Sequence, residues 1–324
     1  MKKKICIRAE GGANIGMGHV MRMLELARQL KKYGEEVFFL SKLDKANLKK
    51  YQSGIDYIKN NQFDVVLVDT RNFWEEIKKV SADIFITDSY DVDDEYFTRI
   101  KQVFPISGYM DDEGICSYFD VDFIINQNPY ADKIKYKANP ASDYLLGTNY
   151  LILRDEFIGK RYDIRKNIKN VMLTLGGSDD NNLTEEIIMN LLPGNYNLRV
   201  GVGSAFLHAD KLKKYENEKI QLFRNACMSE IMSWADVVIT SCGTTAYEVA
   251  SMGVPAIGIA VVDNQEMCAQ KMQDMGVMKI SHDGNYLSLI KTLDYDCRMD
   301  MYQRAAHFID GLGKERLASY ISGL

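Results

Sequence analysis

The stretch KICIRAEGGANIGMGHVMRMLELARQL, residues 4 to 30, decides the expected fold. It opens with a run at 4–9 in which large apolar residues alternate with polar or small ones, as in a β-strand. A glycine-rich loop follows, and from His19 onward apolar residues recur at helical spacing. Gly34, after two lysines, predicts the end of this helix, and EVFFL at 36–40 predicts a second strand. Strand, helix and strand in this order predict a parallel sheet.

The rest of the chain repeats this organisation. Short apolar runs predict strands at 64–69, 83–88, 103–109 and 122–127, and then from 170 and at 198–203, 220–223, 235–241 and 255–261. A charged interval from about Asn149 to Lys169 separates the two groups, and each group opens with a strand that runs into paired glycines. We therefore expect an α/β protein with two Rossmann-like, doubly wound domains. Their expected bounds are 1–150 and 165–324, with the last helix a candidate to pack back on the first domain.

The composition is typical of a globular protein with a large core. Of its 324 residues, 46% are hydrophobic and 26% charged, and the formal net charge is −5. This charge argues against nucleic acid as the main partner, because a duplex binder needs a basic face. The longest apolar stretch, VPAIGIAVV, is too short to span a bilayer, the six cysteines form no Cys-x-x-Cys pair, and the four histidines are scattered. We expect a cytoplasmic protein without membrane insertion, metal or cofactor, and favour a monomer.

The first glycine loop does not match two common phosphate-binding patterns. A dinucleotide fold needs a third glycine where this chain has Met21, and an acidic residue at the tip of the second strand, which here ends in LSK. A P-loop needs Gly-Lys-Ser/Thr, which is missing from the sequence. What remains is a loop in which Gly16 and Gly18 bring the backbone close to a ligand, with a side chain at the start of the helix performing the chemistry.

His19 is the candidate for that chemistry. It falls in the first turn of the expected helix, where the positive end of the dipole disfavours imidazolium. On this argument the ring stays neutral near pH 7 and acts as a general base. The alternative is a polar residue that is merely tolerated at a helix start. Arg8 and Arg22 are candidates for substrate contact, and a solvated or salt-bridged arginine is the alternative for each.

The stretch ITSCGTTAYEVASMGVPAIGI, from Ile239, carries a second pattern. Gly243, Thr244 and Thr245 stand between an expected strand and an expected helix, and such a helix start is an anion site. Thr245-x-x-Glu248 also has the spacing of a capping box, in which Glu248 reaches back to the helix start. The functional alternative is that Glu248 binds a ribose diol beside a bound phosphate. From these residues alone the cap is the favoured interpretation.

The stretch LGGSDDNNLTEE is the third loop. Gly176 and Gly177 end an expected strand, and Asn182-x-x-Glu185 is spaced to cap the next helix. The plain alternative is a tight turn. Loops of the two halves and the Thr244 helix start could all face one interdomain cleft. That arrangement suits a nucleoside diphosphate with a sugar attached.

Taken together, these blocks resemble the UDP-sugar hydrolases of the pseudaminic acid pathway, whose opening motif is Ile-Gly-x-Gly-His-x-x-Arg. The first block is IRAEGGANIGMGHVMRMLELARQL, and later blocks follow in the family's order. They are DSYDVD, DFIINQNPYA, LRDEF, LTLGGSDDNNL, GTTAYEVASMGVP, VVDNQE and IDGLGKERL. The resemblance covers nearly the whole chain, and some spore-coat polysaccharide proteins share the pattern.

The resemblance implies a glycosyltransferase-B fold, similar to the lipid II N-acetylglucosaminyltransferase. It implies hydrolysis of UDP-2,4-diacetamido-2,4,6-trideoxy-β-L-altropyranose to UDP and the free sugar, without a metal. It implies that His19 is catalytic, with Tyr90 and Asn264 near the sugar. It also implies that Thr244, Thr245 and Ala246 hold the diphosphate by their backbone, that Glu248 takes the ribose, and that uracil lies against the backbone from Phe223 to Asn225. Further expected substrate contacts are Gly16, Gly18, Arg8, Arg22, Gly177, Gly243 and Gln265.

Two departures from the family pattern concern the sugar. Ser89 stands where the family has histidine, and Glu10 where it has aspartate. Both are expected on the sugar side, so they leave the identity of the sugar open. Two other functions stay open as well: a glycosyltransferase that uses a UDP-sugar donor, and a sugar-nucleotide sensor without catalysis.

Overall fold

The computed structural model describes residues 2–12, 15–160, 162–177, 179, 181–203, 206–224 and 226–324. The chain divides into two compact units. Unit 1 comprises Met1–Leu153 together with Leu312–Leu324, and unit 2 comprises Arg154–Gly311. Each unit contains one parallel sheet and is described by itself.

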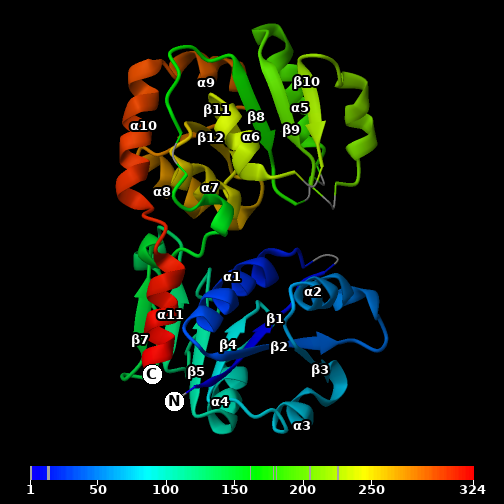
Figure 1. Cartoon of the computed structure of the whole chain (residues 1–324), viewed down its shortest axis with the longest axis vertical. Coiled ribbons are helices and arrows are strands. Elements are labelled where there is room, and N and C mark those ends of the chain that lie inside the picture. The colour runs from blue at the N-terminus through cyan, green and yellow to red at the C-terminus, as the bar shows by residue number, and fades with distance from the viewer. Residues whose placement is uncertain are drawn as a thin grey trace. The chain divides into compact units, whose positions relative to one another are not determined.

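Unit 1 contains a seven-stranded sheet whose pairings are all parallel, in the order β3-β2-β1-β4-β5-β6-β7 (Figure 1). Its strands are β1 (Lys4–Ala9), β2 (Glu36–Leu43), β3 (Val65–Asp69), β4 (Ile84–Asp88), β5 (Ile106–Met110), β6 (Phe123–Asn126) and β7 (Asp143–Leu146). Its helices are α1 (Gly18–Lys32), α2 (Lys49–Asn60), α3 (Phe73–Ile77), α4 (Asp94–Val103) and α11 (Gly313–Gly323). The 3-10 turns are η1 (Thr70–Asn72), η2 (Ala131–Lys133) and η3 (Thr148–Tyr150).

The sheet of unit 1 is covered on both faces because successive side chains of each strand point to opposite sides. Ile5 and Ile7 of β1 pack in one core cluster with apolar residues of α1, α2 and α11. Cys6, between them, packs in the other cluster with residues of α3 and α4. Helices therefore lie on the two faces of the sheet, which is the doubly wound arrangement that the sequence predicts.

The last helix belongs to unit 1, although unit 2 precedes it in the chain. Leu317, Ala318 and Ile321 of α11 are wholly buried in the same core cluster as α1. The Nζ atom of Lys314 lies 3.0 Å from a carboxylate oxygen of Glu25 on α1, and both side chains are buried. Apolar packing and a buried ion pair together hold the chain end against the first helix.

Unit 2 contains a six-stranded parallel sheet in the order β10-β9-β8-β11-β12-β13 (Figure 1). Its strands are β8 (Asn170–Thr174), β9 (Asn197–Gly201), β10 (Ile220–Phe223), β11 (Val237–Ser241), β12 (Ala256–Ile259) and β13 (Lys279–Ile280). Its helices are α5 (Leu183–Leu191), α6 (Met228–Trp234), α7 (Thr244–Met252), α8 (Glu266–Asp274), α9 (Tyr286–Thr292) and α10 (Tyr295–Phe308), with a 3-10 turn, η7, at Asp263–Gln265.

The predicted elements agree with the structure except at two short strands. Each of the eleven predicted strands is present, and the predicted stop at Gly34 is confirmed: its φ is +93°, its amide donates to Lys31, and the Glu35 amide donates to Leu30. Strands β7 and β13 were not predicted. In β7 only Leu145 is buried, and β13 has two residues, so neither leaves a readable apolar pattern.

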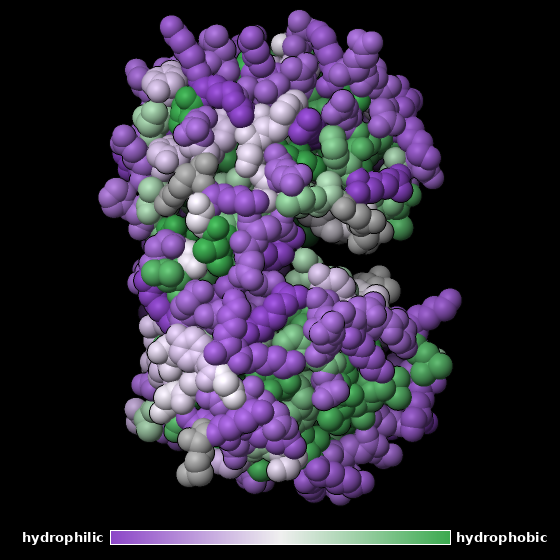
Figure 2. All heavy atoms as spheres, in the orientation of Figure 1, coloured by the Kyte–Doolittle hydropathy of each residue, from purple (hydrophilic) through white to green (hydrophobic). Residues whose placement is uncertain are grey.

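One surface feature of unit 1 is the edge strand β3. Hydrophobic side chains reach the surface in this region (Figure 2), and Val66 and Leu67 of β3 are exposed. Strand β3 is at the edge of the sheet, so it has a neighbouring strand on one side only. Within the described residues, no helix combines the length and the apolar character that crossing a bilayer requires.

Candidate active site

His19 and Asp88 of unit 1 meet where the strand order reverses. Strands β1 and β4 are neighbours in the sheet, although β2 and β3 lie between them in the chain. Ligands of open α/β sheets bind at such a switch point, outside the carboxyl ends of the strands. The glycine loop after β1 leads to His19, the second residue of α1, and Asp88 is the last residue of β4.

His19, Asp88 and Arg22 form a compact group at this point. The His19 Nδ1 atom lies 2.6 Å from Asp88 Oδ1, and both side chains are buried. Arg22, one turn further along α1, donates from Nε and Nη2 to the two oxygens of Asp88, at 2.7 and 2.6 Å. Asp88 therefore accepts a hydrogen bond from the Nδ1–H group of the imidazole, and this tautomer leaves the Nε2 lone pair available to a substrate.

Asp112 extends the group beyond β5. Its two carboxylate oxygens accept hydrogen bonds from Arg22 at 2.9 and 2.8 Å. They also accept one from the Tyr90 hydroxyl at 3.1 Å and one from the Asn128 side-chain amide at 2.9 Å. The Tyr90 ring meets the His19 ring edge to face, with centroids 4.7 Å apart. Arg22 thus bridges two carboxylates, which fixes the position of the groups on either side of it.

The direction of the pKa shift expected for His19 is corrected by these contacts. Burial lowers the pKa of the imidazole, but the charge and hydrogen bond of Asp88, together with the charge of Asp112, oppose this, and the net pKa is raised above its ordinary value. The argument from the helix dipole predicted the opposite direction. Desolvation also acts on the pKa of Asp88, which Arg22 and His19 nevertheless hold well below its usual range. Asp88 therefore stays ionised at neutral pH.

Arg8, a predicted substrate contact, is wholly buried and cannot touch a substrate in this structure. It donates to Glu10 at 2.8 Å, and more weakly to the Ser89 hydroxyl at 3.4 Å. Glu10 and Ser89 are buried as well, so the two departures from the family pattern lie around Arg8 and not on an open surface. Arg22 is salt-bridged, which was the alternative interpretation of that residue.

The glycines of the first loop differ in why the structure needs glycine at each position. A Cβ atom on Gly12 would lie 2.0 Å from a carbonyl oxygen of α2, so this residue serves close packing of the loop on that helix. Gly16 has a φ of +80°, which favours glycine. Gly18 is helical, and none of the described residues comes within 4 Å of its Cβ position, so no close contact among them requires a glycine there.

Unit 2 has a switch point of the same kind, between β8 and β11. Gly177 follows β8 and Gly243 follows β11, and the Ser241 hydroxyl donates to the carbonyl of Leu175 at 3.1 Å, joining the two strand ends. A Cβ atom on Gly177 would meet nothing within 4 Å, and one on Gly243 would meet only Gln265, at 3.7 Å. The backbone is accessible at both glycines.

The start of α7 has the structural features that an anion-binding site requires. Thr244 is exposed and begins the helix, and the first turn carries no acidic residue. The first amides of an α-helix lack acceptors within the helix, and the dipole adds positive potential there. The Ala246 amide donates to the carbonyl of Gly243 at 3.0 Å. The amides of Thr244 and Thr245 are therefore better placed than that of Ala246 to bind an anion.

Glu248 does not form the capping box that the residues alone favoured. Gly243 is the N-cap residue, and no side chain caps this helix start. Instead, Arg154 donates from Nε to Glu248 Oε1 at 2.8 Å, and another nitrogen of Arg154 pairs with Glu156 at 2.7 Å. Burial raises the pKa of the Glu248 carboxyl, and Arg154 opposes this only in part. The arginine displaces the cap because a charged partner binds a buried carboxylate more strongly than a backbone amide.

The remaining candidates of unit 2 lie in loops. Asn264 is exposed in η7, and Gln265 accepts a hydrogen bond from the Val261 amide at 3.0 Å. Asn225 lies outside the described residues. The predicted cap by Asn182 is wrong, because the Asp179 carboxylate accepts from the first amides of α5 at 2.8 Å. Asn182 occupies the cap position in a left-handed conformation.

Four residues of these groups were missed from the sequence: Asp88, Asp112, Asn128 and Arg154. The first three carry a readable signal, because acidic and amide residues end or follow several predicted strands: Asp88 ends β4, and the other two follow β5 and β6. Arg154 has no such signal. Among the described residues, no group of three or more histidines, cysteines or carboxylates is arranged to hold a metal ion.

Comparison with solved structures defines the class of fold. MurG of Acinetobacter baumannii matches with a TM-score of 0.71, covering 99% of this chain and 100% of that chain, at 16% sequence identity. The glycosyltransferase SsfS6 of Streptomyces sp. SF2575 gives 0.61 at 13% identity, covering 98% and 99%. With its two parallel sheets, the chain has the glycosyltransferase-B fold.

Sequence relatives are distant, and no family model matches the chain. An uncharacterized protein of Methanocaldococcus jannaschii is 29% identical over 82% of this chain, and the match spans only 57% of that protein. The spore coat polysaccharide biosynthesis protein SpsG of Bacillus subtilis is 24% identical over 98% of this chain and 97% of its own length. The UDP-2,4-diacetamido-2,4,6-trideoxy-β-L-altropyranose hydrolase of Campylobacter jejuni is 25% identical over 84% and 97%. The chain is thus a distant relative of a spore coat polysaccharide protein and of a UDP-sugar hydrolase.

Proposed function

We propose that this protein hydrolyses a UDP-linked diacetamido-trideoxy hexose to UDP and the free sugar. A water oxygen bonds to the anomeric carbon, the bond from that carbon to the diphosphate oxygen breaks, and the water proton passes to His19. The observation that carries the proposal is the buried pair of His19 and Asp88 at the switch point of unit 1. The named activity of the distant Campylobacter relative supports the choice of substrate. The free sugar would enter nonulosonic acid or surface polysaccharide biosynthesis.

In this mechanism Asp88 holds the imidazole with Nδ1 protonated, so that Nε2 takes the proton from water. Arg22 and Asp112 hold Asp88 and Tyr90 in place, and Tyr90 contacts the sugar. Because Tyr90 is about half exposed and its ring lies against His19, a sugar bound there would be near the base.

Unit 2 holds the nucleotide in this proposal. The diphosphate binds at the start of α7, where the Thr244 and Thr245 amides stabilise the charge that develops as UDP leaves. Glu248 Oε1 is taken by Arg154, and a ribose diol would use Oε2. The open space at Gly177 and Gly243 lets a ligand approach the backbone closely.

Release of UDP without an acceptor tests the proposed reaction. The purified protein is incubated with UDP-sugars, including the diacetamido-trideoxy substrate, and UDP and free sugar are measured in equal amounts. A transferase needs an acceptor before UDP appears at a comparable rate. A sensor binds the sugar nucleotide and releases no UDP, and either result would overturn the hydrolase.

The pH dependence of hydrolysis should show the pairing of His19 with Asp88. The base must be neutral, so kcat/KM is expected to fall about tenfold per pH unit below the pKa of His19. Since Asp88 raises that pKa, the midpoint should lie above about 6.5, the ordinary histidine value. Rates measured from pH 5 to 9 check this, and a midpoint below 6.5 would contradict the pairing.

Glu248→Ala is expected to weaken UDP binding by about 1.5–3 kcal/mol, the range for a charge-assisted hydrogen bond. Calorimetric titration of the variant with UDP measures this loss of binding free energy. Glu156→Gln is the matched control, because it also removes a carboxylate from Arg154 but not the proposed ribose acceptor. Equal losses in the two variants would assign the effect to Arg154 and remove the ribose role from Glu248.

Gly18→Ala separates a packing glycine from one that a ligand approaches. The Cβ position is open and the residue is helical, so stability should be unchanged or rise by up to about 1 kcal/mol. If the substrate approaches the backbone here, KM rises while the melting temperature does not fall. An unchanged KM would place the sugar away from Gly18.

A further inference from the structure

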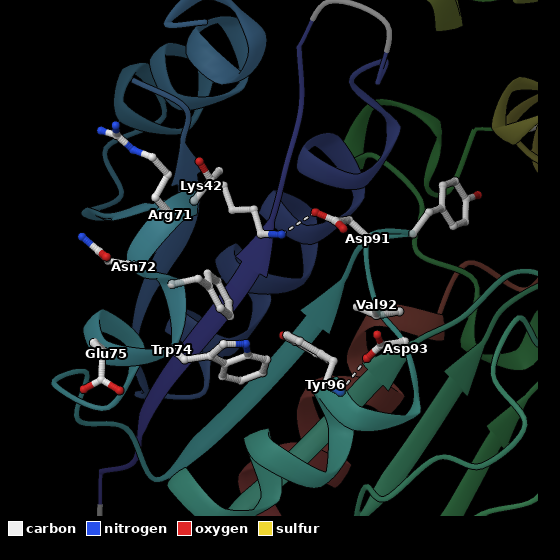
Figure 3. Close-up of a pocket in the computed structure, with 12 residues that line it drawn as sticks. Lys42, Arg71, Asn72, Trp74, Glu75, Asp91, Val92, Asp93 and Tyr96 are labelled. Atoms are coloured by element: carbon white, nitrogen blue, oxygen red, sulfur yellow. Dashed lines mark hydrogen bonds and ion pairs between the residues drawn. The ribbon is translucent and has the colours of Figure 1, made fainter. Parts of the chain in front are cut away.

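A cavity of about 440 Å³ opens beyond the carboxyl ends of β2, β3 and β4 in unit 1 (Figure 3). Its walls are the end of β2 with Lys42, the segment of η1 and α3 that includes Trp74, and the segment from Tyr90 to Tyr96. This cavity is distinct from the group formed by His19, Asp88 and Arg22, none of which lines it.

The floor of the cavity is aromatic. Phe73 and Tyr96 are buried, Trp74 is half-buried, and its ring centroid lies 5.1 Å from that of Phe73 and 5.7 Å from that of Tyr96. The buried guanidinium of Arg8 supports the floor, 5.2 Å from the Phe73 centroid and 4.8 Å from that of Tyr96. Of the three rings, the indole is the one that a ligand can reach most readily.

The two cationic side chains that line the cavity, Lys42 and Arg71, are each paired with a carboxylate. Lys42 forms an ion pair with Asp91 above the rings, and Asp93 caps α4 through the Tyr96 amide, as the dashed lines in Figure 3 show. Arg71, Asn72 and Glu75 point away from the rings (Figure 3), and Arg71 pairs with Asp69. Both cations of the cavity therefore have a carboxylate partner, and an anionic ligand would have to displace it.

We propose that this cavity binds an uncharged saccharide. One face of a pyranose is apolar and packs on an aromatic ring, while its hydroxyl and acetamido groups need donors and acceptors at the edge of that ring. The indole of Trp74 supplies the aromatic ring, and the paired Lys42 and Asp91 supply the donor and the acceptor at its edge. A nucleobase would stack on the ring but would leave most of the polar groups at its edge without a hydrogen-bond partner.

The segment from Asp88 to Asp93 separates this saccharide site from the candidate active site. Asp88 binds His19 on one side of the segment, and Asp91 binds Lys42 on the other. Tyr90 lines the cavity while its ring lies 4.7 Å from His19. The site is thus adjacent to the catalytic group but separate from it, and the proposal does not depend on the hydrolase activity.

Intrinsic fluorescence tests the proposal, because the chain has only two tryptophans. Trp234→Phe leaves Trp74 as the sole reporter. This variant is titrated with N-acetyl-D-glucosamine and with its β-1,4-linked dimer, and in parallel with inorganic phosphate and uridine. We expect a saturable change with the two sugars and none with phosphate or uridine. A saturable change with phosphate or uridine, or none with either sugar, would overturn the proposal.

Two variants in the same background locate the binding. Asp91→Asn is expected to weaken sugar binding about 10-fold, because it removes one charge-assisted hydrogen bond. Glu75→Gln is the control: its side chain lines the same cavity but points away from the rings, so the affinity should be unchanged. Saturation-transfer NMR of the sugar with Trp74→Leu, checked for folding by its melting curve, should show loss of the signal. Equal affinities of the Asp91 and Glu75 variants would place the sugar elsewhere.

Discussion

Replacing His19 by asparagine is expected to lower the rate of UDP-sugar hydrolysis by about 10²-fold or more, the usual effect of removing a positioned acid–base group. Asparagine keeps a donor for Asp88, so the buried carboxylate stays hydrogen-bonded and the variant should fold. UDP should bind with unchanged affinity, because the proposed nucleotide contacts lie in unit 2. Single-turnover rates, UDP titration and melting curves on one preparation measure all three quantities.

His282→Asn is the matched control for that variant. His282 is exposed in unit 2, so the same change of residue type should leave turnover unaltered. A purely structural His19 gives another result: a lower melting temperature with turnover per folded molecule preserved. A folded His19→Asn protein with near-native turnover would end the proposed mechanism.

Asp88→Asn is expected to lower the turnover rate about as much as His19→Asn does, for a different reason. The amide of asparagine can donate to Nδ1, which places the imidazole proton on Nε2 and removes the base. We expect a loss of roughly 10²- to 10⁴-fold in kcat, by the logic of the aspartate in serine-protease triads. Arg22 also loses one of its two carboxylate partners, so the free energy of unfolding should fall by about 1–3 kcal/mol.

Asp112→Asn separates these two effects. It also removes a carboxylate from Arg22, and its loss of stability should be similar, but it leaves the contact between His19 and Asp88 in place. Its turnover should fall less than that of Asp88→Asn. Measuring kcat and denaturant unfolding on both variants decides, and equal losses of turnover would mean that the imidazole tautomer is not what Asp88 controls.

Much of the fold and part of the candidate site could be predicted from local patterns. The helix after the first glycine loop, its stop at Gly34 and the strand ends that carry Asp88 and Gly243 all follow from residue spacing over one or two turns. Strands β7 and β13 could not be predicted, because each buries too few side chains to leave a pattern. The glycine-rich segment could be predicted to form a loop, but the structural role of each glycine could not. Gly12 is needed for close contact with α2, whereas the Cβ position of Gly18 is open.

The sequence by itself determined the order of strands and helices and the places where loops bring chemistry to strand ends, because these depend on neighbours in the chain. Only the tertiary structure decided which groups pair. Asp88 is 69 residues from His19, and Arg154 is 94 residues from Glu248. These contacts reversed the expected pKa shift of the histidine and replaced the expected cap at Glu248. The physical reason is that Coulomb energies, hydrogen bonds and desolvation depend on distance and burial in space, which the spacing of residues along the chain does not specify.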